Sequence, residues 1–157
     1  MKILTYERND SPRLGFMLGD TFIDPLDAGG DPALFADSIA FIRGGEAALM
    51  AARALLSTAP RHPIADIRLL SPMIPTTILC SGSNYRAHNA EKANAPLSGQ
   101  EPEFFVKTGD CVIGPEDSIL YDPILTRKLD CETELAVVIG KPGRHIAVDD
   151  APGHIFG

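Results

Sequence analysis

Apolar residues recur at helical spacing over one long stretch of this chain, residues 33–56, and most of the remainder consists of short β-like runs punctuated by proline and glycine. Within the stretch, Gly44-Gly45 separates two predicted helices, Ala33–Arg43 and Glu46–Leu56. This pattern predicts a fold of the α+β class, in which a few helices pack on sheet.

The first part of the chain is predicted to be a small α/β domain. Gly19-Asp20 is a plausible tight hairpin turn between two of its strands. The predicted strands are Lys2–Tyr6, Leu14–Leu18 and Thr21–Ile23. We expect the two helices to pack on this sheet. Beyond Pro60-Arg61-His62-Pro63 the character of the sequence changes, so we place a domain boundary near residue 70.

The second part of the chain is predicted to be mainly strand. Asn84–Ala93 is its one predicted helix, because apolar and polar residues alternate there at helical spacing. The predicted strands are Thr77–Cys80, Glu103–Lys107, Ser118–Tyr121 and Glu132–Gly140. The chain is therefore expected to have a domain at residues 1–70 and a second, β-rich part at residues 71–157.

Charge and hydropathy exclude several classes of partner. The 157 residues include 21 acidic and 14 basic side chains, a formal net charge of −7, and no run rich in lysine or arginine. Nucleic acid and anionic membrane are therefore not expected as partners. No apolar run approaches the ~18 residues that a membrane-spanning helix needs, and the N-terminus lacks the apolar stretch of a signal peptide. We expect a cytoplasmic protein.

Three carboxylates alternate along the predicted strand that begins near Leu129. Alternate side chains of a strand lie on one face, so Asp130, Glu132 and Glu134 would point together. They would repel one another, and a hard divalent cation held by oxygen ligands would relieve that repulsion. On spacing alone, a solvent-exposed face of an antiparallel strand is the simpler interpretation.

His88 and Glu91 lie three residues apart in the predicted helix and so share one of its faces. A carboxylate that orients an imidazole makes a general base able to take a proton from water. The alternative is that the two residues form an incidental charge pair on an exposed helix, since a single pair of this spacing is common.

Lys107 is a further candidate at the end of an apolar run. It is either a solvated residue at the end of a strand or a group that holds a substrate carboxylate.

Several segments, taken in order, resemble the fumarylacetoacetate hydrolase family over roughly residues 70 to 157. The segments are Ile78–His88 with Glu91, Phe105-Val106-Lys107, Val112-Ile113-Gly114-Pro115, Leu129–Lys141 and Ile155-Phe156-Gly157. The N-terminal part is similar to the small domain that many bacterial members carry. Each motif alone is modest, whereas the ordered set is specific.

The resemblance implies a role for each candidate pair. Glu132 and Glu134 would contribute two ligands to a Mg²⁺ or Mn²⁺ ion, with Ca²⁺ as a further candidate. His88 and Glu91 would form the dyad that activates water.

The resemblance also implies a substrate and a fold. Lys107 would line the substrate pocket, and we expect Tyr85 and Arg86 to contact the substrate with it. The substrate would be a small diketo-acid or related oxo-acid with carboxylate ends. The fold implied is a mixed β-roll, usually a homodimer. Relatives continue past the equivalent of Phe156-Gly157 into a segment that carries a third metal ligand, so we expect residues 71–157 to be the first part of an incomplete roll.

Three functions follow from these expectations. The first is metal-dependent hydrolysis of a carbon–carbon bond in an oxo-acid of the fumarylpyruvate or acylpyruvate type, a chemistry of aromatic-compound catabolism. The second is decarboxylation or enol–keto isomerisation, because the same metal-stabilised enolate serves all three reactions. The third is an inactive binding or assembly fragment that lacks the third metal ligand.

Overall fold

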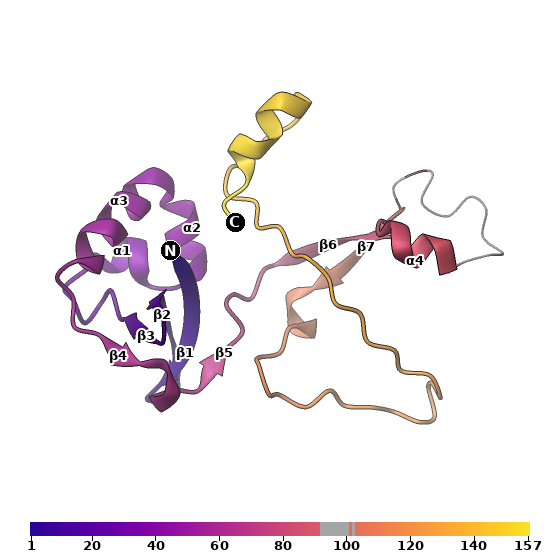
Figure 1. Cartoon of the computed structure of the whole chain (residues 1–157), viewed down its shortest axis with the longest axis horizontal. Helices are drawn as coiled ribbons and strands as arrows, with labels where there is room; N and C mark the ends of the chain where they lie inside the picture. The colour runs from indigo at the N-terminus through magenta and orange to yellow at the C-terminus, as the bar shows by residue number, and fades with distance from the viewer. Residues whose placement is uncertain (92–100, 102) are drawn as a thin grey trace. The chain divides into compact units, whose positions relative to one another are not determined.

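The computed structural model describes residues 1–91, 101 and 103–157 (Figure 1). The chain divides into two compact units, Met1–Met73 with Gly114–Gly157, and Ile74–Ile113. The domain boundary near residue 70 stays a prediction.

A five-stranded antiparallel sheet forms the first unit's framework, in the order β4-β3-β2-β1-β5. Its strands are β1 (Lys2–Arg8), β2 (Ser11–Leu18), β3 (Thr21–Ile23), β4 (His62–Pro63) and β5 (Leu69–Leu70). The three strands predicted before the helices are confirmed, the first two being longer than predicted.

Two tight turns set the register of the first three strands. Arg8 pairs with Ser11 across Asn9 and Asp10, which have φ values of 50° and 59°. Positive φ at both turn positions matches the right-handed twist of a hairpin, and asparagine and aspartate tolerate it best after glycine. Leu18 pairs with Thr21 across Gly19-Asp20, where Gly19 has a φ of 66°. The predicted turn at Gly19-Asp20 is confirmed.

Three helices, not two, cover one face of this sheet (Figure 1). They are α1 (Pro32–Phe35), α2 (Ser38–Arg43) and α3 (Gly45–Leu56). The prediction of one helix over Ala33–Arg43 is wrong because Asp37 adopts extended backbone, with a φ of −156° and a ψ of 178°. Its side chain accepts a hydrogen bond from the Ala40 amide at 2.7 Å and so begins α2.

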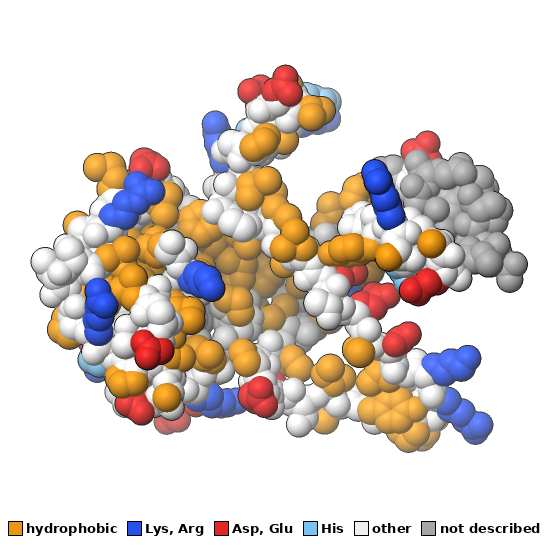
Figure 2. All heavy atoms as spheres, viewed as in Figure 1, with side chains coloured by type: hydrophobic (Ala, Val, Ile, Leu, Met, Phe, Trp, Pro, Cys, Tyr) orange, Lys and Arg blue, Asp and Glu red, His pale blue; other side chains and the backbone are white. Residues whose placement is uncertain are grey.

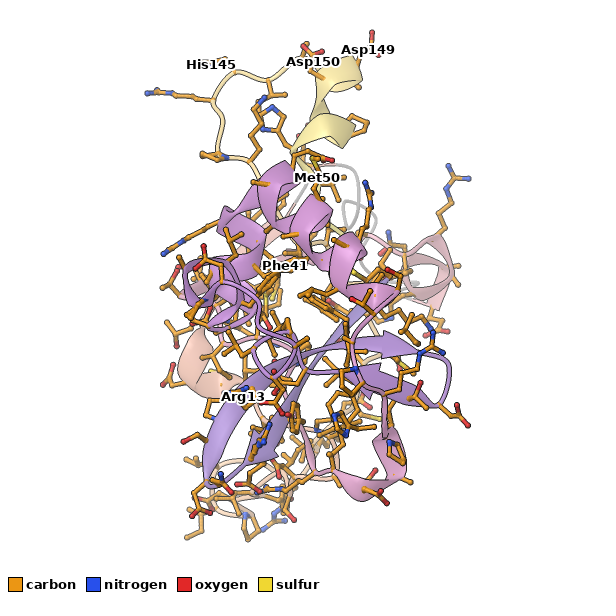
Figure 3. All side chains as sticks on the ribbon, turned by 90° about the vertical axis from the view of Figure 1, so that its left-hand side faces the viewer. Arg13, Phe41, Met50, His145, Asp149 and Asp150 are labelled. Atoms are coloured by element: carbon orange, nitrogen blue, oxygen red, sulfur yellow. The ribbon has the colours of Figure 1, made fainter. Side chains whose placement is uncertain are left out.

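The sheet has an apolar cluster on each face. Between the helices and the sheet lies the larger cluster, of Leu14, Phe16, Ile23, Phe35, Phe41, Ala48 and Ala52. Figure 3 shows Phe41 in this layer. Leu4, Tyr6 and Phe22 form the smaller cluster, against which Ile64, Ile67 and Leu69 pack. Burial of both clusters fixes the strand register, because a shift of one residue would exchange the two faces.

The second unit is an antiparallel pair of strands with one short helix. β6 (Thr77–Gly82) pairs with β7 (Glu103–Thr108) from Thr77 opposite Thr108 to Gly82 opposite Glu103. Both predicted strands are confirmed. The helix α4 (Arg86–Glu91) follows β6 and confirms the predicted helix over its described part. The last predicted residues, 92 and 93, lie outside the described residues.

Residues 114–157 of the first unit contain little regular structure. The predicted strands Ser118–Tyr121 and Glu132–Gly140 are wrong, since neither segment belongs to a strand. A strand needs a neighbour for its backbone hydrogen bonds, and the described part of this segment provides one isolated bridge, between Ile139 and Ile155. Hydrophobic side chains of this segment, such as Leu120 and Ile124, are exposed. Figure 2 shows hydrophobic side chains at the surface of the molecule.

The mixture of helices and antiparallel strands confirms the predicted α+β class. The described strands form two separate sheets and no closed barrel. None of the helices in residues 1–91 and 103–157 is both long and apolar enough to cross a membrane.

Candidate active site

His88 and Glu91 lie on one face of α4, as their spacing predicts. The Nδ1 atom of His88 is 3.8 Å from Oε2 of Glu91. Both side chains are open to solvent, with exposed fractions of 45% and 78%. The carboxylate is thus close enough to attract a protonated imidazole and to bias which ring nitrogen carries the proton of a neutral one. An imidazole held in this way can donate or accept a proton.

Tyr85, Arg86 and Lys107, the residues expected to contact substrate, lie in the same unit as this pair. Tyr85 immediately precedes α4, Arg86 is the first residue of the helix, and both are exposed. Lys107 stands on β7 opposite Ile78, and its Nζ atom is 5.6 Å from the centre of the Phe105 ring. The Lys107 ammonium is exposed and makes no ion pair with any residue in the described part of the chain. It is a cation that a substrate carboxylate can approach.

Glu132 and Glu134 lie in the other unit, on the exposed segment that precedes the bridge at Ile139. Neither makes an ion pair with a residue that the structure describes. As a donor set, two free carboxylates suit a hard divalent cation. A complete cation site needs more ligands, and residues 1–91 and 103–157 contain no group of three or more histidine, cysteine or acidic side chains that could hold one.

The described residues therefore bring together part of the predicted site. The pair His88–Glu91 is formed, and the three expected substrate contacts belong to the same unit. The two expected metal ligands belong to the first unit. The assignment of these seven residues to catalysis, substrate and metal stays a prediction.

A shallow hollow of about 530 Å³ lies in the segment that leads to the C-terminus. Figure 3 labels two residues of this region, His145 and Asp150. The hollow is lined by Lys141, Gly143, Arg144, His145, Ile146, Ala147, Asp150, Gly153 and His154. It contains none of the seven predicted site residues.

A buried carboxylate, Asp24, forms the most enclosed ionic cluster of the first unit. Its side chain accepts hydrogen bonds from the Tyr6 hydroxyl at 2.7 Å and from Nε and Nη2 of Arg13 at 3.0 Å each. The backbone amides of Leu26 and Asp27 also donate to it. Burial raises the pKa of Asp24, but these hydrogen bonds outweigh burial and hold the pKa below its usual value. The sequence patterns did not reveal this cluster.

Arg68 and Asp117 link the start of the segment 114–157 to the sheet. Arg68 lies 3.0 Å from Asp117 and 3.3 Å from Glu7 on β1. The Gly114 amide donates to Asp117 at 2.8 Å and, with the Arg68 guanidinium, lowers the pKa of Asp117. This link holds Gly114 and Asp117 against the sheet of the first unit.

Comparison with known proteins identifies the family. Residues 77–157 match the family described as fumarylacetoacetate (FAA) hydrolase, C-terminal. The chain belongs to the fumarylacetoacetate hydrolase family. The matched residues include β6, α4, β7 and the segment that carries Glu132 and Glu134.

Oxaloacetate tautomerases are among the relatives that the chain resembles in sequence. Two mitochondrial oxaloacetate tautomerases of Homo sapiens are each 39% identical to the chain over 129 residues, which is 81% of the chain and 40% of each relative. A mitochondrial oxaloacetate tautomerase of Xenopus laevis is 37% identical over the whole chain, which corresponds to 50% of that relative. The chain thus spans half or less of the length of these relatives.

Solved structures of the family share the fold over the whole chain. Maleylpyruvate hydrolase from Sphingobium sp. SYK-6, in complex with manganese(II) and pyruvate, is 31% identical with a TM-score of 0.78, and the chain covers 56% of it. A fumarylacetoacetate hydrolase from Exiguobacterium antarcticum is 28% identical with a TM-score of 0.75, and 53% of it is covered. The α+β arrangement is thus a portion of the family fold.

Proposed function

We propose that this chain carries the acid–base part of an enzyme that interconverts the enol and keto forms of a small oxo-acid. The observation that carries the proposal is the His88–Glu91 pair, with 3.8 Å between Nδ1 and Oε2. The names of the tautomerase relatives, 39% identical, favour isomerisation over the other reactions of the family.

In this proposal His88 moves the proton. Ketonisation of an enol removes a proton from the enol oxygen and adds one to the neighbouring carbon. An imidazole beside a carboxylate serves both directions, since it can hold the proton between the two steps. Glu91 orients the ring, while Lys107 attracts the carboxylate of the oxo-acid. Tyr85 and Arg86 add hydrogen-bond donors next to α4.

Glu132 and Glu134 are the residues that would hold a divalent cation in this proposal. Such a cation, when bound, stabilises negative charge on a substrate oxygen. The manganese(II) of the maleylpyruvate hydrolase structure supports the choice of cation. Glu132→Gln is expected to weaken Mn²⁺ binding, measured by titration calorimetry, whereas Asp149→Asn, which also removes an exposed carboxylate, is expected to leave it unchanged. Equal affinity in both variants would contradict the assignment.

Activity measurements test the role of His88. With oxaloacetate as substrate, His88→Gln is expected to slow ketonisation by about 10²- to 10⁴-fold, the usual contribution of a positioned acid–base group. Glu91→Gln should cause a smaller loss, because the imidazole remains. His62→Gln is the matched control, an exposed histidine on β4 in the first unit. Unchanged activity of the His88 variant would exclude the proposed role.

Hydrolysis is the second candidate, favoured by the likeness to maleylpyruvate hydrolase over the whole chain. Here His88 would take a proton from water, the resulting hydroxide would add to a carbonyl of a diketo-acid, and the neighbouring carbon–carbon bond would break. The electron pair of that bond leaves as an enolate, which is then protonated. Product analysis on one 1,3-diketo-acid and one β-keto-acid separates hydrolysis, decarboxylation and isomerisation.

A further inference from the structure

The described part of α4, the helix that carries His88, spans six residues, Arg86–Glu91. A helical segment of this length keeps its orientation mainly through contacts with its surroundings. Five of the six side chains are exposed, and Asn89 alone within α4 is half-buried. Asn89 is thus the most enclosed residue in the described part of the helix.

Asn89 makes such a contact with the end of β6. Its Nδ2 atom donates a hydrogen bond to the Ser83 carbonyl oxygen at 2.6 Å, across six residues of sequence. Its own backbone amide donates to the Tyr85 carbonyl at 3.0 Å, within the first turn of the helix. The side chain thus ties the helix to the residue that follows β6.

Two features mark this contact as specific. Ser83 has a φ of 54°, in the left-handed region that residues other than glycine rarely adopt, and its carbonyl is the one that accepts the Asn89 amide. The Oδ1 atom of Asn89 is buried and has no hydrogen-bond partner among the described residues. The amide is held in place by its donor group, although its acceptor is unsatisfied.

Helix geometry separates this anchor from the reacting pair. Successive residues of an α-helix are rotated by about 100°, so Asn89 lies about 100° from His88 and about 160° from Glu91 around the helix axis. The face that carries Glu91 therefore points away from the face that is anchored. Asn89 lies between His88 and Glu91 in the sequence, so the Asn89–Ser83 bond holds the helical turn that sets the separation of the imidazole and the carboxylate.

We propose that Asn89 is a positioning residue for the His88–Glu91 pair, acting through its hydrogen bond to the Ser83 carbonyl. The proposal rests on the proposed function, because the pair is the acid–base group of that function. Asn89 does not touch the reacting atoms. It holds the first turn of α4 so that the ring and carboxylate keep one mutual arrangement.

The ring nitrogens of His88 provide a readout that does not require activity. A carboxylate beside Nδ1 favours the neutral tautomer that carries its proton on Nδ1, and ¹⁵N NMR of the full chain distinguishes the two tautomers. Glu91→Ala removes the carboxylate and defines the shift in tautomer population that loss of the pair causes. Asn89→Ala and the similarly shaped Asn89→Leu remove the amide donor without changing charge.

A matched control separates positioning from helix stability. Alanine and leucine are better helix formers than asparagine, so both Asn89 variants raise the intrinsic helix propensity of α4. Ala87→Ser, at an exposed position of the same helix, lowers that propensity and keeps the Asn89 amide. If fraying of α4 controlled the pair, the serine variant would have the larger effect.

We expect both Asn89 variants to reproduce most of the shift that Glu91→Ala causes, and Ala87→Ser to reproduce little of it. Tautomer populations that stay unchanged in both Asn89 variants would overturn the positioning role and leave the proposed function standing. An effect of Ala87→Ser as large as theirs would also overturn it. If Glu91→Ala itself leaves His88 unchanged, the pair does not act as a unit, and the proposed function fails with the inference.

Discussion

Asp24 shows how a single buried side chain can determine the stability of the first unit. Its side chain is 1% exposed and lies 2.9 Å from Nη2 of Arg13, which Figure 3 labels on β2. Removing one partner of a buried ion pair leaves the other charge without compensation. The Tyr6 hydroxyl and two backbone amides would lose their acceptor at the same time.

We therefore expect Asp24→Ala to lower the free energy of unfolding by about 3–5 kcal/mol, the usual cost of breaking a buried pair. Urea denaturation followed by circular dichroism measures this difference. Asp10→Ala is not a suitable control because Asp10 has a positive φ, whereas Asp10→Asn keeps the preferred turn chemistry and should change stability by less than about 0.5 kcal/mol. A loss below about 1 kcal/mol for Asp24→Ala would contradict the network.

Tyr6 gives a prediction at alkaline pH. Burial, and then the hydrogen bond to Asp24, raise its pKa to about 12 from an ordinary value of about 10. Between these values the folded chain keeps a proton that the unfolded chain releases, so the associated stability is complete below about pH 10 and is lost as the pH rises to about 12.

Tyrosinate absorbance tests this assignment. The absorbance step that disappears in Tyr6→Phe should be centred near pH 12 in the folded chain. If the step that Tyr6→Phe removes is instead centred near pH 10, the ordinary pKa of tyrosine being about 10, the Tyr6 hydroxyl is not buried and bonded to Asp24 as described.

At this scale, sequence patterns predict contacts between close neighbours. His88 and Glu91 are three residues apart, and the helical repeat alone brings them together. Asp24 contacts Tyr6 and Arg13, which are 18 and 11 residues away in the sequence. Strand pairing brings these residues together although they are far apart in the sequence, so no local sequence pattern indicates the cluster. The anchor at Asn89 depends in the same way on the left-handed backbone of Ser83.

Among the elements, the break between α1 and α2 follows from one capping side chain. The Asp37 carboxylate accepts a hydrogen bond from the Ala40 amide. It thereby replaces the backbone carbonyl that a preceding turn of helix would have provided. Loss of this cap in Asp37→Ala should lower the free energy of unfolding by about 1 kcal/mol. Asp37→Asn retains a capping oxygen and should cost only a few tenths, as measured by thermal unfolding.

This pair of variants separates the hydrogen bond from charge. If asparagine destabilises the chain as much as alanine does, the negative charge of Asp37 acts on the helix dipole and the cap contributes little. If neither substitution has an effect, residues 33–43 tolerate a continuous helix and the observed break has another cause.

Element predictions succeeded where all the determinants are local. Gly19-Asp20 fixes a two-residue turn, and β2 and β3 follow on either side. The alternation of acidic residues at Asp130, Glu132 and Glu134 predicts a strand equally well, yet a strand exists only where a neighbour accepts its backbone hydrogen bonds. That neighbour is a property of the tertiary fold, which the pattern of one segment does not contain.

At the scale of the whole molecule, the first unit joins two distant parts of the sequence, Met1–Met73 and Gly114–Gly157. Phe156 provides an apolar link between them. It packs against the larger core cluster, and its ring meets the Phe41 ring edge-on with 5.7 Å between centres. The backbone of Phe156 and Gly157 is bonded to Val138, at 2.8 and 2.7 Å. The core thereby holds the segment that follows Glu132 and Glu134.

Phe156→Ala should therefore free this segment while the five-stranded sheet stays folded. Phe156 is half-buried, so we expect a loss of about 1–3 kcal/mol, less than for a fully buried phenylalanine. Ile155→Ala is the matched control, because Ile155 is 48% exposed and does not belong to the core cluster. Limited proteolysis should cut within residues 138–157 faster in the Phe156 variant than in the control, because cleavage follows the population of the opened segment. Equal rates in the two variants would mean that the Val138 hydrogen bonds, which both retain, hold the segment without the aromatic contact.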